Sequence, residues 1–309
     1  MANAFQKAKK EKIYVKALLF GSSGSGKTYS ALRLATGIYK NCGGTGIAVI
    51  DTEAGRSKYY ANEFDFDVLE LSEPYTPEKF IDAIQAAING GYKVLVIDST
   101  SHEWQYLTAQ ANAQSTKNPY AAWGKLKPRH RVFMEKLLFS PIHIISTGRG
   151  KDEYTMDDSE GKKALKKVGV GVQQDKDAEY DYTIAFNIMQ DTHMAEATKD
   201  NTHLFEGNIR ILTEEDGEKL FNWANSGDSE SDRYTNTATS ADLTASLAED
   251  NVDDLIQQIT ALFKDKMEQG IEKEKLYGVV AENNNGTKNF ATIKDAETAN
   301  RVIEALLNI

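Results

Sequence analysis

The sequence has a single cysteine, Cys42, in 309 residues. One cysteine excludes an internal disulfide framework and a metal site of the Cys-x-x-Cys type. Long apolar runs are also missing, since no stretch approaches the roughly 20 residues that a bilayer-spanning helix needs. The first twelve residues are polar and rich in lysine, unlike the apolar core of a secretory signal. These absences predict a cytoplasmic protein with no membrane partner.

An excess of basic charge is absent too, because the formal net charge is −10 at pH 7. Residues 226–309 hold 16 acidic and 8 basic side chains, whereas residues 1–225 hold 30 and 28. The acidity therefore belongs mainly to the C-terminal part. A uniformly basic surface for nucleic acid is excluded, so any DNA site must be a local patch.

One short stretch has the pattern G-x-x-x-x-G-K-S/T of a phosphate-binding P-loop. Glycines let the backbone approach an anion closely, so that successive N–H groups point at phosphate oxygens, and the helix that follows adds the positive end of its dipole. Residues 13–20 are predicted to form a strand and residues 29–39 a helix, the context that the motif requires. We expect an ATP site in which Lys27 reaches the β- and γ-phosphates. Its residues are Gly21, Ser22, Ser23, Gly24, Ser25, Gly26, Lys27, Thr28 and Tyr29.

Apolar stretches and helical patterns alternate along residues 1–225. Buried strands are predicted at residues 46–50, 94–98 and 142–147, and a helix begins after the N-cap Thr76. This alternation is typical of a mainly parallel sheet flanked by helices. Later elements are expected to be a charged hairpin over residues 151–177, strands over 182–189 and 193–198 that extend the sheet antiparallel, and a helix over 213–225.

The C-terminal part has a different composition. Residues 226–244 are rich in Ser, Thr, Asp and Asn, which predicts a flexible linker. Apolar residues at helical spacing then predict a small helical domain over residues 245–309. The expected organisation is an α/β P-loop ATPase domain over 1–225, the linker, and the helical domain.

Two carboxylates are expected at the ends of predicted strands. Asp98 ends the strand 94–98, where it lies beside Thr28, and the pair is predicted to hold Mg²⁺. Hydrolysis also needs a carboxylate that orients and deprotonates the attacking water. Because Ser99 occupies the position directly after Asp98, the candidate is Glu53, after the neighbouring strand 46–50. The alternatives are an N-cap role for Asp98 and an exposed loop position for Glu53.

The strand 142–147 is expected to lie beside the strand that carries Asp98. Polar groups at its end can sense the γ-phosphate, and the candidates are Ser146, Thr147 and Arg149. The sequence does not decide among the three. The five histidines show no metal-ligand spacing, so Mg²⁺ is the only metal predicted.

The P-loop, Ile-Asp-Thr-Glu-Ala at 50–54 and Ile-Asp-Ser at 97–99 resemble the core of RecA-type recombinase ATPases. Residues 12–225 resemble phage-encoded, RecA-like AAA-family ATPases, including those grouped with single-strand annealing recombinases. The resemblance implies a RecA-like P-loop NTPase core, Mg²⁺-dependent ATP hydrolysis with Glu53 in the catalytic role, and a homo-oligomer in the form of a ring or filament. It also implies that Lys199 acts on a neighbouring subunit's nucleotide. Asn201 replaces the second basic residue of that pattern, so a solvated lysine is the alternative.

Two basic stretches occupy the positions where RecA-like proteins carry their DNA-binding loops. Cations combined with aromatic side chains suit single-stranded DNA, through phosphate neutralisation and base stacking. Acidic residues interrupt the second stretch, so a solvated charge run is the alternative. The predicted DNA-binding residues are Lys125, Lys127 and Arg131 in the first stretch, and Lys162, Lys163, Lys166 and Lys167 in the second.

Three functions are consistent with these features. The first is an ATPase that binds single-stranded DNA and promotes annealing or strand pairing in phage recombination or replication, in the host cytoplasm. The second is a replicative helicase or helicase loader. The third is a nucleotide-dependent switch or assembly factor that does not bind DNA. The C-terminal helical domain is expected to bind DNA or a partner, such as a single-strand-binding protein or another replication protein.

Overall fold

The computed structural model describes residues 7–114, 119–157, 164–175, 177–231, 233–234, 252, 255–256, 259–267 and 269–307. The chain divides into two units, Met1–Thr237 and Ala238–Ile309, and each is described by itself. Residues 235–244, most of the predicted linker, lie outside the described residues. Among the described residues, no helix has the length and apolar character that a membrane crossing requires.

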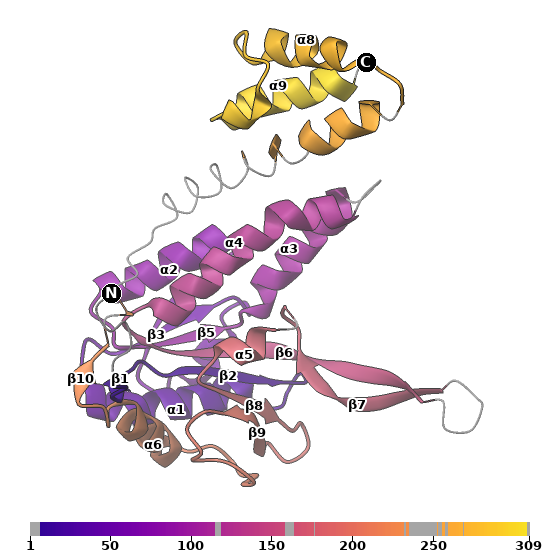
Figure 1. The fold of residues 1–309 in the computed structure, drawn as a ribbon. Coiled ribbons are helices and arrows are strands. Elements are labelled where there is room, and N and C mark those ends of the chain that lie inside the picture. Colours follow the sequence, from indigo (N-terminus) through magenta and orange to yellow (C-terminus); the bar gives the residue numbers. More distant parts are fainter. Residues whose placement is uncertain are drawn as a thin grey trace. The chain divides into compact units, whose positions relative to one another are not determined.

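A mainly parallel sheet forms the centre of the first unit (Figure 1). Its strand order is β4-β3-β5-β6-β2-β8-β9, and β7 pairs only with β6. Strands β7 and β9 are antiparallel to their neighbours and the other pairs are parallel. The strands are β2 (Lys16–Gly21), β3 (Ile47–Asp51), β4 (Asp67–Glu70), β5 (Val94–Asp98), β6 (His143–Asp157), β7 (Ala164–Val172), β8 (Ile184–Ile188) and β9 (Ala195–Asp200). The expected parallel α/β core is confirmed.

Helices cover both faces of this sheet (Figure 1). On one face lie α1 (Lys27–Cys42) and α6 (Glu214–Ala224), and on the other α2 (Pro77–Asn89), α3 (Ser101–Gln114) and α4 (Pro119–Phe139). Because both faces are covered, the central strands β2, β3 and β5 are buried along their whole length and consist mostly of apolar residues. The Thr76 hydroxyl accepts a hydrogen bond from the Lys79 N–H and Pro77 is the first helical residue, as the sequence predicts.

The strand β8 differs from the sequence prediction. Residues 182–189 were expected to extend the sheet antiparallel, but β8 runs parallel to β2. The reason is the path of the chain before it. The Gln173 N–H bonds to the Arg149 carbonyl at one end of the sheet, whereas the Thr183 N–H bonds to the Lys16 carbonyl at the other. Residues 173–183, including the short helix α5 (Ala178–Asp181), therefore return the chain to the start of β2.

Strands β6 and β7 form a long hairpin that projects from the sheet (Figure 1). Its first strand is continuous with the core, because β6 pairs with β2 and β5 near its start and with β7 beyond Gly150. Residues 158–163, which connect the two strands in the sequence, lie outside the described residues. The charged hairpin of the sequence prediction is thus an extension of a central strand.

The second unit is helical. Residues 259–267, α8 (Lys273–Asn283) and α9 (Ala296–Leu307) are helices, and a short 3-10 turn covers Phe290–Thr292. Their apolar faces meet in one core. The buried side chains of that core are Val252, Leu255, Ile259, Phe263, Leu276, Val280, Ile293, Ala299, Val302 and Leu306.

Candidate nucleotide-binding site

The predicted P-loop connects β2 to α1, and α1 begins at Lys27. Gly24 and Gly26 have φ angles of +78° and +91°, in the left-handed region that residues with a Cβ rarely adopt. Gly26 is the N-cap of α1, and its carbonyl accepts the first helical bond from the Ser30 N–H. Strand, glycine-rich turn and helix N-terminus therefore follow one another, an arrangement suited to holding phosphate.

The Lys27 ammonium lies against this loop. Its Nζ donates to the carbonyls of Gly21 and Ser22, at 3.0 and 2.8 Å. Burial lowers the pKa of Lys27, and the nearby carboxylates of Asp98 and Glu53 act in the opposite direction. The lysine is thus a cation placed between the phosphate loop and two acids.

Asp98 and Thr28 meet where the sequence predicts a Mg²⁺ site. The Thr28 hydroxyl donates to one carboxylate oxygen of Asp98 at 2.5 Å, and the Thr147 hydroxyl donates to the other at 2.5 Å. Burial raises the pKa of Asp98, and these two hydroxyls lower it. Oxygen donors fit Mg²⁺, which usually takes only one or two carboxylates and completes its shell with water and phosphate. Among the described residues, no group of three or more His, Cys, Asp or Glu side chains could hold a metal ion. A Mg²⁺ ion at Thr28 and Asp98 would therefore take its other ligands from water and phosphate.

A buried carboxylate shapes the turn that carries Glu53. One oxygen of Asp51 accepts from the N–H groups of Glu53 and Gly55, at 2.7 and 3.2 Å. The other accepts from the N–H and hydroxyl of Ser57, at 2.9 and 2.5 Å. Parallel pairing places Asp51 opposite Asp98, so this turn lies at the same sheet edge as the predicted metal site.

The Glu53 carboxylate is bound by Arg149 from β6. The Arg149 Nη2 atom lies 2.9 Å from both Glu53 oxygens, and its Nε atom lies 3.1 Å from Oε1. Arg149, one of three predicted phosphate sensors, thus contacts the predicted water-activating residue. Ser146 and Thr147 are fully buried on the same strand, and Thr147 bonds to Asp98.

His102 is a neighbour of Glu53 that the sequence analysis did not select. Its Nε2 lies 3.8 Å from Glu53, and its Nδ1 lies 2.6 Å from the Thr52 hydroxyl. The Tyr75 ring stacks on the imidazole with ring centroids 4.8 Å apart. Burial lowers the pKa of His102, with Glu53 acting in the opposite direction. The available signal was its position four residues after Asp98, in the first turn of α3.

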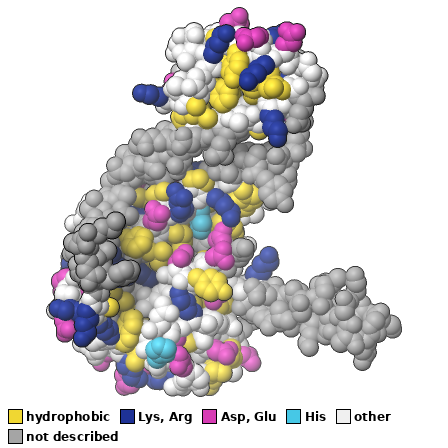
Figure 2. Space-filling model, viewed as in Figure 1, with side chains coloured by type: hydrophobic (Ala, Val, Ile, Leu, Met, Phe, Trp, Pro, Cys, Tyr) yellow, Lys and Arg dark blue, Asp and Glu magenta, His cyan; other side chains and the backbone are white. Residues whose placement is uncertain are grey.

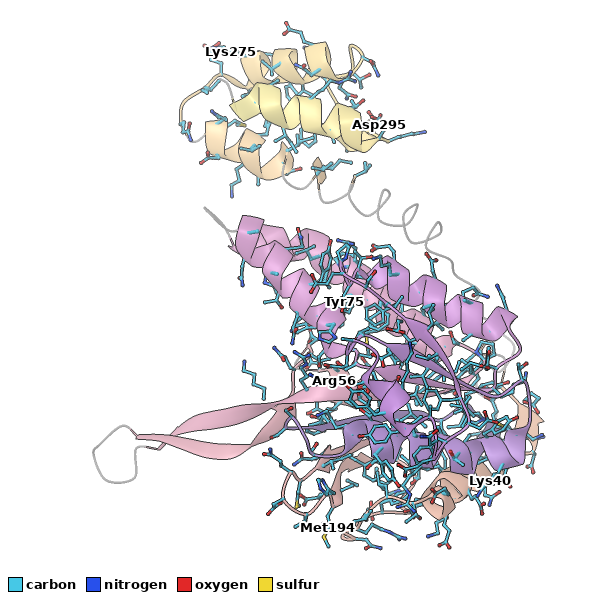
Figure 3. All side chains as sticks on the ribbon, turned by 180° about the vertical axis from the view of Figure 1, so that it is seen from behind. Lys40, Arg56, Tyr75, Met194, Lys275 and Asp295 are labelled. Carbon is cyan, nitrogen blue, oxygen red and sulfur yellow. The ribbon has the colours of Figure 1, made fainter. Side chains whose placement is uncertain are left out.

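Some of these groups line a cavity of about 560 Å³, within the range of roughly 300–1,000 Å³ typical of ligand sites. P-loop residues, Glu53, Asp98 and Arg149 form one part of it. The other part was not predicted from the sequence, and it consists of Arg56, Tyr59, Tyr60, Gly150 and Gln173. Arg56 lies beside the base of the β6–β7 hairpin (Figure 3). The basic and aromatic run directly after Glu53 was the available signal.

A second cavity, of about 680 Å³, adjoins the first through Arg149. It is lined by Glu73, Pro74, Tyr75, His102, Gln105, Tyr106, Ala109 and Arg149. Two of the groups that contact Glu53, Arg149 and His102, therefore face this cavity as well.

Six predicted nucleotide-site residues do not line this cavity: Ser22, Ser25, Tyr29, Ser146, Thr147 and Lys199. The Tyr29 hydroxyl donates to Glu63 at 3.0 Å and its ring packs on Tyr60 and Phe64, so it does not line the cavity. Lys199 is on the edge strand β9, where its Nζ donates to the Tyr180 carbonyl. Its action on a neighbouring subunit stays a prediction.

The predicted DNA-binding residues are only partly described. Lys127 lies 3.8 Å from Asp175, and Arg131 lies 3.7 Å from Glu135. Lys162 and Lys163 lie outside the described residues, as do the side chains of Lys125, Lys166 and Lys167. On the face shown in Figure 2, the described acidic and basic side chains are interspersed. DNA binding therefore stays a prediction.

A family model for an AAA domain matches residues 13–221. Among solved structures, the chain is similar to a KaiC-like protein from the archaeon Pyrococcus horikoshii OT3, with 17% identity and a TM-score of 0.32. That match covers 60% of this chain and 79% of the other. A search of curated proteins finds no match to the sequence.

Proposed function

The chain belongs to the AAA-domain family of P-loop nucleotide-binding ATPases, and from this premise we propose that it uses Mg²⁺-dependent ATP hydrolysis to bind and release single-stranded DNA. The proposed setting is phage recombination or replication, and the proposed outcome is annealing or strand pairing. ATP at an interface between subunits would stabilise a DNA-binding oligomer, and hydrolysis would release it.

The hydrolytic step follows from the groups around the first cavity. Thr28 and Asp98 would hold Mg²⁺, which would supply positive charge to offset the charge of the phosphates. Lys27 neutralises the same phosphates from the loop side. Glu53 orients the attacking water and accepts its proton. Arg149 binds the γ-phosphate oxygens with the donors that otherwise bind Glu53, which frees the carboxylate for the water.

The observation that carries the DNA proposal is the continuity of β6. This strand bears Thr147, bonded to Asp98, and Arg149, bonded to Glu53, and then becomes the first strand of the lysine-rich hairpin. Gln173, just after the second hairpin strand, lines the nucleotide cavity. DNA bound along the hairpin can therefore act on the hydrolytic groups through one continuous strand.

The second cavity supports the same proposal. It presents two aromatic side chains, Tyr75 and Tyr106, together with Arg149 and Gln105. Aromatic and guanidinium faces stack on bases of any sequence, which suits single-stranded DNA. Because Arg149 belongs to both cavities, a base that contacts it would alter its bond to Glu53.

The experiment replaces Lys162, Lys163, Lys166 and Lys167 by alanine, with the fourfold arginine variant as the charge-matched control. We expect the alanine variant to lose single-strand affinity and up to about three units of its log–log salt slope, since each phosphate contact contributes about 0.7. The arginine variant should retain both. DNA-independent ATP hydrolysis should be unchanged in each variant.

Other outcomes of these binding and unwinding assays would favour a different function. If the wild type binds ATP but shows no salt-sensitive binding to single strands, a nucleotide-dependent switch or assembly factor becomes the better description. If it unwinds a forked duplex with ATP, a helicase does. Electron micrographs with ATP, with and without single-stranded DNA, would test the proposed homo-oligomer and distinguish a ring from a filament.

A further inference from the structure

The turn between β8 and β9, residues 189–194, lies against the outer side of the P-loop. We propose that Gln190 and His193 of this turn are positioning residues for the phosphate-binding amides. The inference depends on nucleotide binding alone, and neither DNA binding nor the role of Glu53 enters it.

Two side chains of the turn bind P-loop carbonyls. The Gln190 side-chain amide donates to the Ser23 carbonyl at 3.0 Å. The His193 Nδ1 atom lies 3.0 Å from the Ser25 carbonyl oxygen. A carbonyl can only accept, so the proton of this bond is on Nδ1. The first bond joins residues 167 positions apart in the sequence and the second joins residues 168 apart. In each, the acceptor is a backbone carbonyl of the phosphate loop.

Because the peptide unit is planar, these bonds to the carbonyls also fix the direction of the N–H groups that follow. In a planar trans peptide the C=O and the following N–H point in opposite directions. Donors that hold the Ser23 and Ser25 carbonyls therefore direct the N–H groups of Gly24 and Gly26 to the other side of the loop. Gly24 and Gly26 line the nucleotide cavity, and the turn does not. The amides thus face the space where phosphate would bind before any ligand arrives.

Two P-loop glycines lie close to the end of β8 and to this turn. A Cβ at Gly21 would lie 2.4 Å from the Ile188 carbonyl oxygen, and a Cβ at Gly26 would lie 3.5 Å from His193 Nδ1. Glycine at position 21 therefore allows the loop to approach the end of β8, whereas a Cβ at position 26 would be in ordinary van der Waals contact with the His193 ring. The contact therefore extends along the loop and does not depend on a single hydrogen bond.

The turn itself is closed by backbone bonds. The His193 N–H donates to the Met189 carbonyl at 3.0 Å, and the Met189 N–H donates to the Met194 carbonyl at 2.9 Å. His193 has a φ of +57°, an uncommon value for a residue with a side chain. This conformation directs the imidazole at the P-loop, and such conformations persist where the surrounding structure enforces them.

Pre-organised amides contribute to binding of the β-phosphate in both ATP and ADP, so their loss weakens affinity for both nucleotides. A neutral hydrogen bond of this kind corresponds to about a fivefold change in an equilibrium constant. For Gln190→Ala with His193→Ala we expect the Kd of ATP and of ADP to rise by about tenfold or more. Turnover at saturating ATP should change by less than about threefold, because the hydrolytic groups are untouched.

The test measures ATP and ADP binding to the full chain by fluorescent-nucleotide titration, together with thermal unfolding without nucleotide. His193→Gln keeps a side-chain donor and should restore most of the affinity lost in His193→Ala. Asp191→Ala, at an exposed position of the same turn, is the matched control and should bind ADP as the wild type does. The stabilisation by added ADP should shrink in step with the affinity.

Four results would overturn the proposal. One is wild-type ADP affinity in the folded double variant. Another is lost turnover with unchanged affinity, which would place the turn in the chemical step. The third is a His193→Gln variant as weak as His193→Ala, since a restored donor would then restore nothing. The fourth is a loss of folding stability, measured as a lower unfolding temperature without nucleotide, that is large enough to explain the whole loss of affinity. The turn would then be only a structural support.

Discussion

Replacing Glu53 by glutamine tests the water-activating role most directly. Glutamine keeps the shape and one oxygen acceptor for Arg149, but it cannot take a proton from water. A positioned general base contributes about 10²–10⁴ to a rate, so the barrier to hydrolysis should rise by about 3–5 kcal/mol. Binding should survive, because the Lys27 bonds and the Thr28–Asp98 pair are independent of this substitution.

The assay is single-turnover hydrolysis at saturating ATP and Mg²⁺, with nucleotide affinity measured separately. Glu70→Gln is the matched control, because Glu70 is an exposed glutamate paired with Lys58 at the end of the neighbouring strand β4. It should hydrolyse ATP at the wild-type rate. If Glu53→Gln stays within about threefold of the wild type, another group activates the water and the proposed mechanism fails.

Three further substitutions have defined outcomes. Lys27→Ala should abolish tight ATP binding in titrations with fluorescent ATP, whereas Lys40→Ala, at the end of the same helix, should not. Asp98→Asn should remove the gain in ATP affinity that Mg²⁺ provides and spare metal-free ADP binding, as titrations with and without Mg²⁺ would show. His143→Gln should flatten the pH dependence of stability in urea unfolding. Burial lowers the pKa of His143 to about 3 from 6.5, so the unfolded chain binds the extra proton and wild-type stability falls as the pH drops through this range.

The elements that the sequence predicted well are those whose signals are local. The P-loop pattern requires a strand, two glycines and a lysine within a few residues, and each has a direct structural consequence. Asp98 ends an apolar run, so its place at the sheet edge follows from strand pairing. Glu53 was reached by the same reasoning from the adjacent strand.

The features that could not be predicted from the sequence depend on which segments, distant in the chain, contact one another in the fold. The bond from Arg149 to Glu53 joins residues 96 positions apart, and no local pattern specifies it. His102 contacts Glu53 and Thr52, which are about 50 residues away in the sequence. The packing of α3 against the sheet brings them together, and no local pattern indicates it. The direction of β8 depends on where residues 173–183 return the chain, which neither strand composition nor length determines.

The groups proposed for hydrolysis around Glu53 and the positioning residues around His193 lie on opposite sides of β2. Glu53 follows β3, whereas His193 follows β8, and the sheet order places four strand spacings between them. At about 4.8 Å per spacing this is roughly 19 Å. Substitutions farther apart than about 10 Å, with no shared partner, add to within about 0.5 kcal/mol.

Glu53→Gln should therefore slow turnover, His193→Ala should weaken affinity, and the double variant should show both effects at full size. The measurement is a double-mutant cycle on kcat and on the Kd of ADP. A coupling well above that limit would mean that the turn after β8 and the strand β6 move together. In that case the P-loop would transmit a change from one side of the site to the other, and affinity and chemistry would not be separable in this chain.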